Sequence, residues 1–537
     1  MANRDRMTAA AVPESEPVRV VWLGRIGGPL MALAVYFLMA TAEAPPPEDA
    51  AYPPAESPAV VESLSHEARA TAAIATLMAI WWMTESLPLP VTSLLPIALF
   101  PLAGVLPVER ATAPYADKNI FLFMGGFLIA LAVQRWNLHR RLALLTVLGV
   151  GTSPRFLVGG VMLATAGLSM WISNTAATAM MLPIGMSLVA LLLDKAPGAV
   201  DRARPVESPP TADSRQEAFA TCLMLGIAYS ASIGGMATLI GTPTNLFFAG
   251  FAHEHGIAIT FAGWMALGVP VAAILLVVCW IVLTRLAFRI DLGEIRGGRE
   301  VIRQEWRRLG RISRGEWIVS CVCAGVASAW VAREPLSQWQ WLVAHLPIVA
   351  RLDDTVIAMA GALLLFIIPV DIRRGVFALD WQTARELPWG VLLLFGGGFS
   401  LAAAISGSGL AEWIGGRVAF LEGLPPLALM LVVAAMIVFL TELTSNTATA
   451  AAFLPILYAV ALGIQVDPVL LMVPAALAAS CAFMLPVATP PNAIVFGSGC
   501  VSIGAMVRAG ARLNLIVVVL IPLLVYWLGP WILGIAI

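Results

Sequence analysis

Charged residues are scarce in this chain. Only 12% of its 537 residues are Asp, Glu, Lys or Arg, whereas 59% are hydrophobic. An ordinary soluble domain carries about 25% charged residues, so this chain has too few to solvate a water-facing surface. Apolar stretches of about 20 residues, long enough to cross a bilayer, recur from residue 21 onward. The chain is therefore predicted to be an all-α polytopic membrane protein.

Cysteine, histidine and net charge are also low. The six cysteines lie in apolar segments without metal-like clustering and are interpreted as buried hydrophobes. The five histidines lie in flanks or loops, so none supplies the membrane-depth base that Ser408 would need in an intramembrane protease. We therefore reject an enzyme, and we treat His253-Glu254-His255 as a loop coincidence rather than a metal site. A net charge of −1 gives no argument for nucleic acid as a partner.

The charged residues that do occur indicate how the spans are oriented. Segment 43–67 is acidic and holds no Lys or Arg, whereas 135–141 and 285–314 are rich in Arg. The positive-inside rule makes the two basic segments cytoplasmic. With about 11 spans, the N-terminus is expected inside and the C-terminus outside. The expected spans are 21–42, 68–84, 88–107, 119–135, 216–250, 258–286, 316–332, 353–370, 389–406, 468–500 and 512–535.

Three polar or ambiguous segments complete this organisation. Residues 1–20 are expected to be a disordered cytoplasmic N-terminus. The apolar run that follows is interpreted as a first span, although Ala40-Thr41-Ala42 resembles a signal-peptide cleavage site. Segment 287–314 places Ile295, Ile302, Trp306 and Leu309 on one helix face, which predicts an amphipathic helix at the cytoplasmic interface rather than a solvated basic loop.

The chain contains an internal repeat. The sequence Phe-Met-Gly-Gly-Phe-Leu at 123–128 resembles Phe-Gly-Gly-Gly-Phe-Ser at 395–400, and Ser-Asn-Thr occurs at 173–175 and again at 445–447. Both pairs are 272 residues apart, as from Ser173 to Ser445. A third pair, Gly-Thr-Pro-Thr-Asn at 241–245 and Ala-Thr-Pro-Pro-Asn at 488–492, follows in the same order. The span at 119–135 is expected to start outside and its counterpart at 389–406 inside, so the repeats are inverted, which is typical of secondary transporters.

The repeated motifs carry polar chemistry into apolar segments. Ser, Asn and Thr form helices poorly, so each tripeptide is expected where a helix breaks inside the protein and lines a cavity. Such a break exposes N–H groups that favour an anion and oxygens that favour Na⁺. Pro243, Pro490 and Pro491 prevent continuous helix. The alternative is that small and hydroxylated residues here serve only helix packing.

Two further observations bear on ion coupling. No Lys or Arg lies near the two Ser-Asn-Thr tripeptides or the two proline-containing motifs in the sequence. The charge of a bound anion must therefore be offset by helix ends and co-bound cations. Glu442 and Glu85 are the notable acids at membrane depth. An intramembrane acid indicates function by default, and Glu442 either attracts cations or relays protons, or else anchors the segment by hydrogen bonds.

These motifs, together with Thr84-Glu85-Ser86-Leu87-Pro88-Leu89-Pro90, resemble the divalent anion:sodium symporter family. The resemblance covers roughly residues 70–537 and implies a homodimeric elevator-type transporter with two re-entrant hairpins, each tipped by a Ser-Asn-Thr. Without it, two short full spans would fit equally well. It also implies co-transport of Na⁺ with a C4-dicarboxylate such as succinate, malate or fumarate, no organic cofactor, and a place in the cell (plasma or inner) membrane.

The resemblance also assigns residues. The first Na⁺ site would use Ser169, Ser173, Asn174 and Gly241, and the second Thr441, Thr444, Asn446 and Ala488. The substrate carboxylates would contact Ser173, Asn174, Thr175, Ser445, Asn446, Thr447, Thr489 and Pro490. Two alternatives stay open, a Na⁺-independent dicarboxylate exchanger and a transporter of sulfate or another inorganic di-anion.

The expected domains follow from the repeat. Residues 21–118 form N-terminal scaffold helices, and 258–388 form further scaffold helices with the amphipathic segment. The transport regions are 119–257 and 389–510, and 511–537 is a final transmembrane helix.

Overall fold

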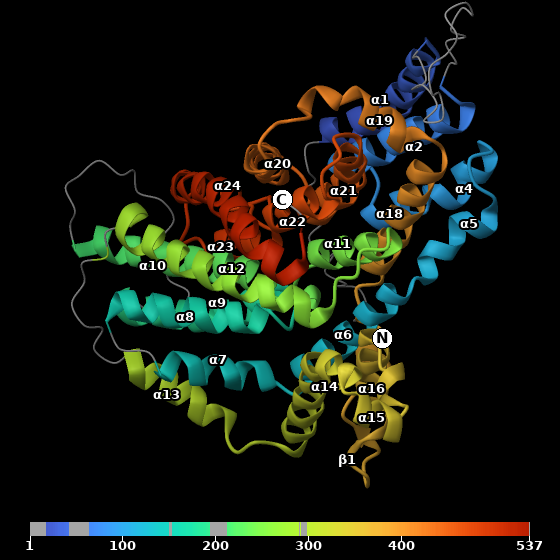
Figure 1. Cartoon of the computed structure of the whole chain (residues 1–537). Helices are drawn as coiled ribbons and strands as arrows, with labels where there is room; N and C mark the ends of the chain where they lie inside the picture. The colour runs from blue at the N-terminus through green and yellow to red at the C-terminus, as the bar shows by residue number, and fades with distance from the viewer. Residues whose placement is uncertain are drawn as a thin grey trace, which may run out of the picture.

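The computed structural model describes residues 18–41, 64–149, 153–193, 212–288, 290 and 298–535. Most of these residues are helical, and the only strands among them are β1 (Pro369–Asp371) and β2 (Val376–Phe377), which pair antiparallel. Figure 1 shows the helices packed as long rods in several layers. The all-α prediction is confirmed. The expected N-terminal segment 1–20, the acidic segment 43–67 and Ile295 lie largely or wholly outside the described residues.

The N-terminal helices pack as a hairpin that the Thr-Glu-Ser-Leu-Pro motif holds together. The Ser86 hydroxyl donates to the Val21 carbonyl over 3.1 Å, and Arg25 Nε donates to the Ser86 carbonyl over 2.8 Å. This motif therefore fastens the first helix to the second. The helices are α1 (Val18–Leu38), η1 (Met39–Thr41), α2 (His66–Met83), α3 (Leu89–Thr92), α4 (Leu95–Leu102), α5 (Val108–Thr112) and η2 (Ala113–Ala116).

The first repeat contains a helical hairpin followed by a broken helix. The hairpin is α8 (Pro154–Ser169) and α9 (Asn174–Leu193), and both of its helices pack against α10 (Ala212–Gly235). After η3 (Leu239–Gly241), the chain resumes helix at Pro243, where the missing N–H of proline costs nothing. Its other helices are α6 (Lys118–Arg135), α7 (Leu138–Gly149) and α11 (Pro243–Glu254).

The second repeat has the same order of elements. Its hairpin is α20 (Pro426–Thr441) and α21 (Asn446–Gly463), and both helices pack against α22 (Pro468–Ala479). Helix stops at Ala479 and resumes at Pro490, so the interruption expected within 468–500 is confirmed. The remaining elements are α18 (Trp389–Gly407), α19 (Leu410–Arg417), η6 (Ala419–Leu421), α23 (Pro490–Gly497) and α24 (Ile503–Leu533).

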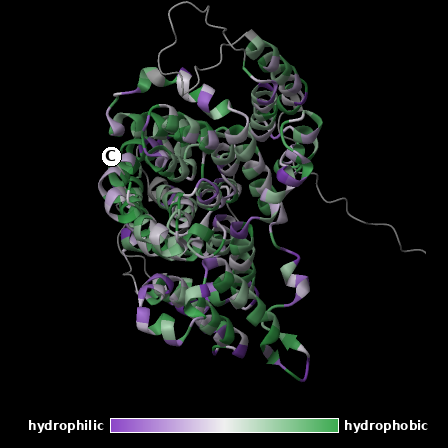
Figure 2. Cartoon of the chain, turned by 45° about the vertical axis from the view of Figure 1, so that its right-hand side comes forward, coloured by the Kyte–Doolittle hydropathy of each residue, from purple (hydrophilic) through white to green (hydrophobic). Residues whose placement is uncertain are grey.

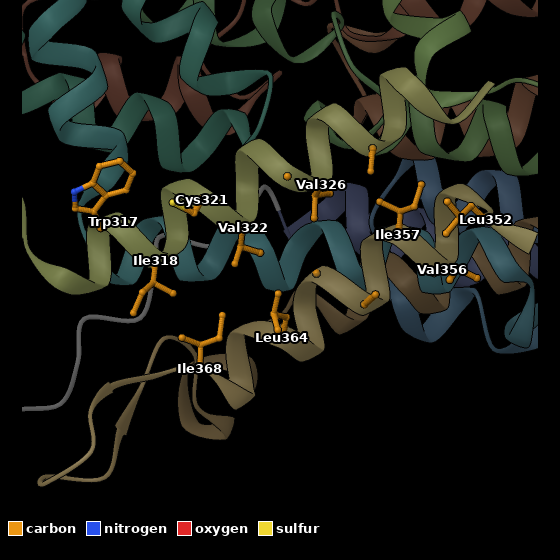
Figure 3. Close-up of a pocket in the computed structure, with 14 residues that line it drawn as sticks. Trp317, Ile318, Cys321, Val322, Val326, Leu352, Val356, Ile357, Leu364 and Ile368 are labelled. Carbon is orange, nitrogen blue, oxygen red and sulfur yellow. The ribbon is translucent and has the colours of Figure 1, made fainter. Parts of the chain in front are cut away.

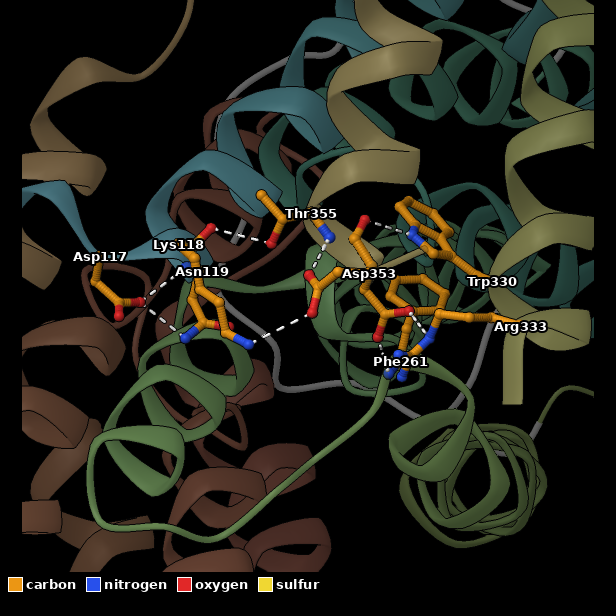
Figure 4. Close-up of polar contacts among 9 residues, drawn as sticks. Asp117, Lys118, Asn119, Phe261, Trp330, Arg333, Asp353 and Thr355 are labelled. Carbon is orange, nitrogen blue, oxygen red and sulfur yellow. Dashed lines mark hydrogen bonds and ion pairs between the residues drawn. The ribbon is translucent and has the colours of Figure 1, made fainter. Parts of the chain in front are cut away.

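The segment between the repeats is attached to α6 of the first repeat through a polar junction. Asp353 and Asp354 precede or begin α16 (Asp354–Ile367); Asp353 pairs with Lys118 of α6, and Asp354 accepts from the Phe261 N–H (Figure 4). Arg333 approaches Asp354 from α14 at 2.8 Å. The segment comprises α12 (Phe261–Ile281), the π-helical η4 (Val282–Ala287), α13 (Gly298–Leu309), α14 (Arg314–Gln338), α15 (Gln340–His345), η5 (Val349–Arg351), α16 and α17 (Trp381–Ala384).

The expected amphipathic helix is present as α13, which is held by a buried ion pair. Arg141 of α7 lies 2.8 Å from Glu316, donates to the Gly310 carbonyl, and sits 5.2 Å from the Trp306 ring. Arg140 pairs with Glu305 over 2.6 Å. The two basic segments that were expected on one side of the membrane therefore contact each other.

The repeated glycine motif serves close packing. A Cβ on Gly125 would lie 2.8 Å from the Ala358 backbone, and one on Gly397 would lie 2.3 Å from the Ser93 carbonyl oxygen. No side chain fits at either distance. The motif lets α6 pack closely against α16, and α18 against α3. The two glycines occupy corresponding positions of the two repeats.

The outer surface is apolar, as a membrane-facing surface requires. Figure 2 shows hydrophobic residues over most of the helices, and an apolar groove of about 850 Å³ runs between α14 and α16 past Trp317, Val322 and Val356 (Figure 3). Eight helices of the described part are long and apolar enough to cross a membrane. Every expected span except 68–84 falls on one of these, on a shorter apolar helix or on a broken pair, and 68–84 falls on α2, which is not among the eight.

Candidate substrate and cation site

Each Ser-Asn-Thr occupies the turn between the two helices of a hairpin. Asn174 is the first residue of α9 and Asn446 the first of α21. A helix N-terminus presents unpaired N–H groups and a partial positive charge, which together attract an anion. The structure therefore places two such ends in corresponding positions of the two repeats.

The first hairpin turn contains a pair of side-chain oxygens. The buried Ser169 hydroxyl donates to Asn174 Oδ1 over 2.6 Å. A Cβ on Gly235 would lie 2.4 Å from the same Oδ1, and one on Gly241 would lie 2.4 Å from the Gly235 carbonyl oxygen. The end of α8, the start of α9 and the break after α10 thus meet where two glycines leave room.

The second hairpin turn repeats this arrangement with a third oxygen. The Thr441 hydroxyl lies 2.7 Å from Asn446 Oδ1 and 2.9 Å from the Ala479 carbonyl oxygen. One hydroxyl proton cannot satisfy both acceptors. Three oxygens that share one proton form a cluster suited to a hard cation, which takes oxygen ligands.

Two asparagines hold the helix breaks in matching ways. Asn245 donates to the carbonyls of Gly235 and Thr238, ten and seven residues earlier. Asn492 donates to those of Ala482 and Leu485, at the same two separations. Each amide therefore replaces helical hydrogen bonds that are lost at its break. The two repeats share even these individual hydrogen bonds.

Contacts between the repeats bring the four motifs into one interior. Thr244 lies 2.7 Å from Ser480 through their hydroxyls. In addition, α11 packs against α21, and α23 packs against α9. Each broken helix thus touches the hairpin of the other repeat.

The other expected substrate residues border this interior with different exposure. Ser173, Thr175 and Pro490 are exposed, Ser445 and Thr447 are half-buried, and Thr489 is buried. Thr489 caps α23 by accepting from the Asn492 N–H.

Thr444 and Ala488 of the expected second cation site are half-buried and buried. The Thr444 hydroxyl bonds to the Leu440 carbonyl and to Thr449. Its side chain is therefore already engaged in two hydrogen bonds.

Sequence reasoning missed several residues of the site. Gly235 and Ala479 contribute through the backbone, which no side-chain pattern reveals. The repeat offered a signal for Gly235 only, which, like Ala482, lies ten residues before a motif asparagine. The anchoring alternative for Glu442 is the one that the hydrogen bonds support, because its carboxylate accepts from three backbone N–H groups and Asn514.

Repeated hairpins, helices broken at their polar motifs and an apolar exterior define an integral membrane protein of the secondary-transporter class. The family model for the sodium:sulfate symporter transmembrane region matches residues 58–535, and the chain belongs to that family. The resemblance expected from the motifs is thereby confirmed.

Curated relatives agree along most of the chain. A sodium-dependent dicarboxylate transporter, SdcS, of Staphylococcus saprophyticus is 42% identical over 476 residues, 88% of each protein. The protein of that name from Staphylococcus aureus (strain USA300) is 42% identical over 466 residues, 86% of each.

Two solved structures show the same fold at low identity. The YdaH transporter of Alcanivorax borkumensis superposes with a TM-score of 0.53 at 14% identity, covering 96% of this chain and 99% of that one. MtrF of Neisseria gonorrhoeae gives 0.56 at 12% identity, covering 94% of each.

Proposed function

We propose that this protein is a secondary active transporter that couples the movement of a C4-dicarboxylate such as succinate to Na⁺ symport. The observation that carries the proposal is the matched pair of oxygen clusters, each beside a Ser-Asn-Thr at a helix N-terminus. The relatives named sodium-dependent dicarboxylate transporters support both the ion and the substrate class.

The two oxygen clusters are the proposed cation sites. Ser169, Ser173, Asn174 and Gly241 bind the first Na⁺, and Thr441, Thr444, Asn446 and Ala488 bind the second. In each site, the asparagine carbonyl is already held by a hydroxyl from the end of the preceding helix. The ligands are therefore oriented before the ion arrives, so little ordering accompanies binding.

A dicarboxylate has one carboxylate for each hairpin. One is bound by Ser173, Asn174 and Thr175, and the other by Ser445, Asn446 and Thr447, with Thr489 and Pro490 at the adjacent break. Helix N-termini and hydroxyls supply donors without a fixed positive charge. Because each asparagine belongs to both an anion and a cation site, occupancy of one favours occupancy of the other.

The domain motion, the oligomeric state and the membrane orientation are proposed from the repeat and the family resemblance. The transport regions 119–257 and 389–510 move as an elevator against the scaffold helices 21–118 and 258–388, within a homodimer in the cell membrane. The N-terminus is cytoplasmic, and the C-terminus after 511–537 is external. Contact between the Arg-rich segments supports their placement on one side.

Uptake into proteoliposomes tests the function. Radiolabelled succinate and sulfate are supplied with Na⁺, K⁺ or choline on both sides of the membrane. We expect succinate uptake only with Na⁺. Equal succinate uptake in choline would contradict symport, and counterflow against internal succinate in Na⁺-free buffer would then identify the cation-independent exchanger. Na⁺-dependent uptake of sulfate alone would favour an inorganic di-anion transporter.

A further inference from the structure

The break between α22 and α23 is held open by a buried carboxylate. Glu442 follows directly after Thr441 and is 3% exposed. One of its oxygens accepts from the backbone N–H of Phe483 over 2.6 Å and of Met484 over 2.8 Å, and the other from that of Leu485 over 3.1 Å. Asn514 of α24 adds a fourth donor at 2.7 Å.

These bonds determine where the carbonyls of α22 point. In a continuous helix, the Phe483 N–H would bond to the Ala479 carbonyl, four residues earlier. Glu442 takes that N–H, so the Ala479 oxygen loses this helical donor and accepts instead from the Thr441 hydroxyl over 2.9 Å. The carboxylate thereby supplies the second oxygen cluster with its third member.

The first repeat has no such group. The position 272 residues before Glu442 is Met170, and the corresponding N–H groups of Met236 and Ala237 bond instead to carbonyls three residues earlier. The N–H groups of the break after α10 are thus paired within the break, whose Thr238 hydroxyl donates to the Met170 carbonyl, whereas those of the break after α22 are paired by an acid from the neighbouring hairpin. The hydrogen bonds that repeat so closely elsewhere differ at this point.

We propose that Glu442 is the positioning residue of the second cation site and makes the two sites unequal. Four donors face its carboxyl group, which suits the ionised acid, since that form has only acceptors. It fixes the Ala479 carbonyl for Na⁺ and adds a negative charge that the first repeat lacks. The second site therefore binds Na⁺ more tightly than the first. This inference rests on the proposed function.

The test is the Na⁺ concentration for half-maximal succinate uptake in Glu442→Gln, normalised to folded protein. Glutamine keeps the shape but loses the charge and one acceptor oxygen. Loss of one charged hydrogen bond corresponds to about tenfold or more in affinity. We expect half-saturating Na⁺ to rise by about tenfold, with a smaller change in the succinate KM at saturating Na⁺. Glu334→Gln, the same change at an exposed acid of α14 outside both sites, should leave both constants unchanged.

A second variant covers the case in which Glu442→Gln does not fold. Asn514→Leu removes one of the four donors, and the Asn514 Oδ1 has no hydrogen-bond partner among the described residues. Half-saturating Na⁺ should rise a few-fold. Normal Na⁺ dependence in the folded fraction of whichever variants fold would overturn the positioning role. Loss of Na⁺ dependence in the wild type would overturn the proposed function itself, so the two failures are distinct.

Discussion

Truncating the two motif asparagines tests the site most sharply. Asn174→Ala and Asn446→Ala each remove a carbonyl oxygen from a proposed cation site and an amide donor from the proposed substrate site. Loss of a charge-linked hydrogen bond costs about 1.5–3 kcal/mol, or roughly tenfold to a hundredfold in affinity. Loss of the linked cation adds to that. We therefore expect both variants to lose measurable transport at ordinary Na⁺ and substrate concentrations.

The structure further predicts that the two variants differ in stability. In Asn446→Ala, the Thr441 hydroxyl keeps the Ala479 carbonyl as a partner, so unfolding should become easier by less than about 1 kcal/mol. In Asn174→Ala, the buried Ser169 hydroxyl loses the one hydrogen bond that the described residues give it. An unsatisfied buried donor costs about 1–3 kcal/mol, so this variant should melt earlier.

The assay is uptake normalised to folded protein, with melting curves in detergent and Asn119→Ala as a control outside both sites. Any uptake measured at raised substrate concentration should require more Na⁺ than in the wild type. Near-normal specific transport in both variants would refute the site assignment. A lower melting temperature with normal transport by the folded molecules would show that the asparagines serve packing alone.

Three further predictions concern helix packing and the orientation of the chain in the membrane. Breaking the buried Arg141–Glu316 pair with Arg141→Ala should destabilise the protein by about 3–5 kcal/mol, because it leaves an uncompensated charge, and melting curves that match the wild type would contradict this. Gly397→Ala places a Cβ 2.3 Å from the Ser93 carbonyl and should lower the unfolding free energy by about 1–3 kcal/mol. The control Gly325→Ala meets nothing within 4 Å and should stabilise its helix by about 0.5–1 kcal/mol. Equal melting temperatures of the two variants would refute this distinction. Single cysteines at the exposed Arg307 and Glu109, in a cysteine-depleted background, should react with impermeant reagents from the cytoplasmic and external sides respectively, and labelling of both from one side would refute the orientation.

Much of the fold could be predicted because the membrane leaves few choices. Apolar length fixed the spans, and prolines marked their breaks, as at Pro243 and Pro490. The two Ser-Asn-Thr turns were predictable because poor helix formers cannot face lipid unpaired. The constant separation of 272 residues then revealed the repeat.

The rest depends on contacts between distant segments. Nothing near Ala479 in sequence shows that its carbonyl loses its helical donor, because the competing N–H is taken by Glu442 from another helix. For the same reason, sequence left the role of Glu442 open between ion attraction and anchoring. The glycine motif was visible, but its packing partners, such as Ser93 and Ala358, were not.

The central claim is that Na⁺ binding drives dicarboxylate movement through the paired hairpins. The most direct measurement is a time course of radiolabelled succinate in proteoliposomes that contain no internal dicarboxylate, under an inward Na⁺ gradient. Na⁺-coupled symport should produce transient accumulation above the external concentration, abolished when a Na⁺ ionophore collapses the gradient. Uptake that never exceeds the external concentration, or that requires internal dicarboxylate, would contradict it.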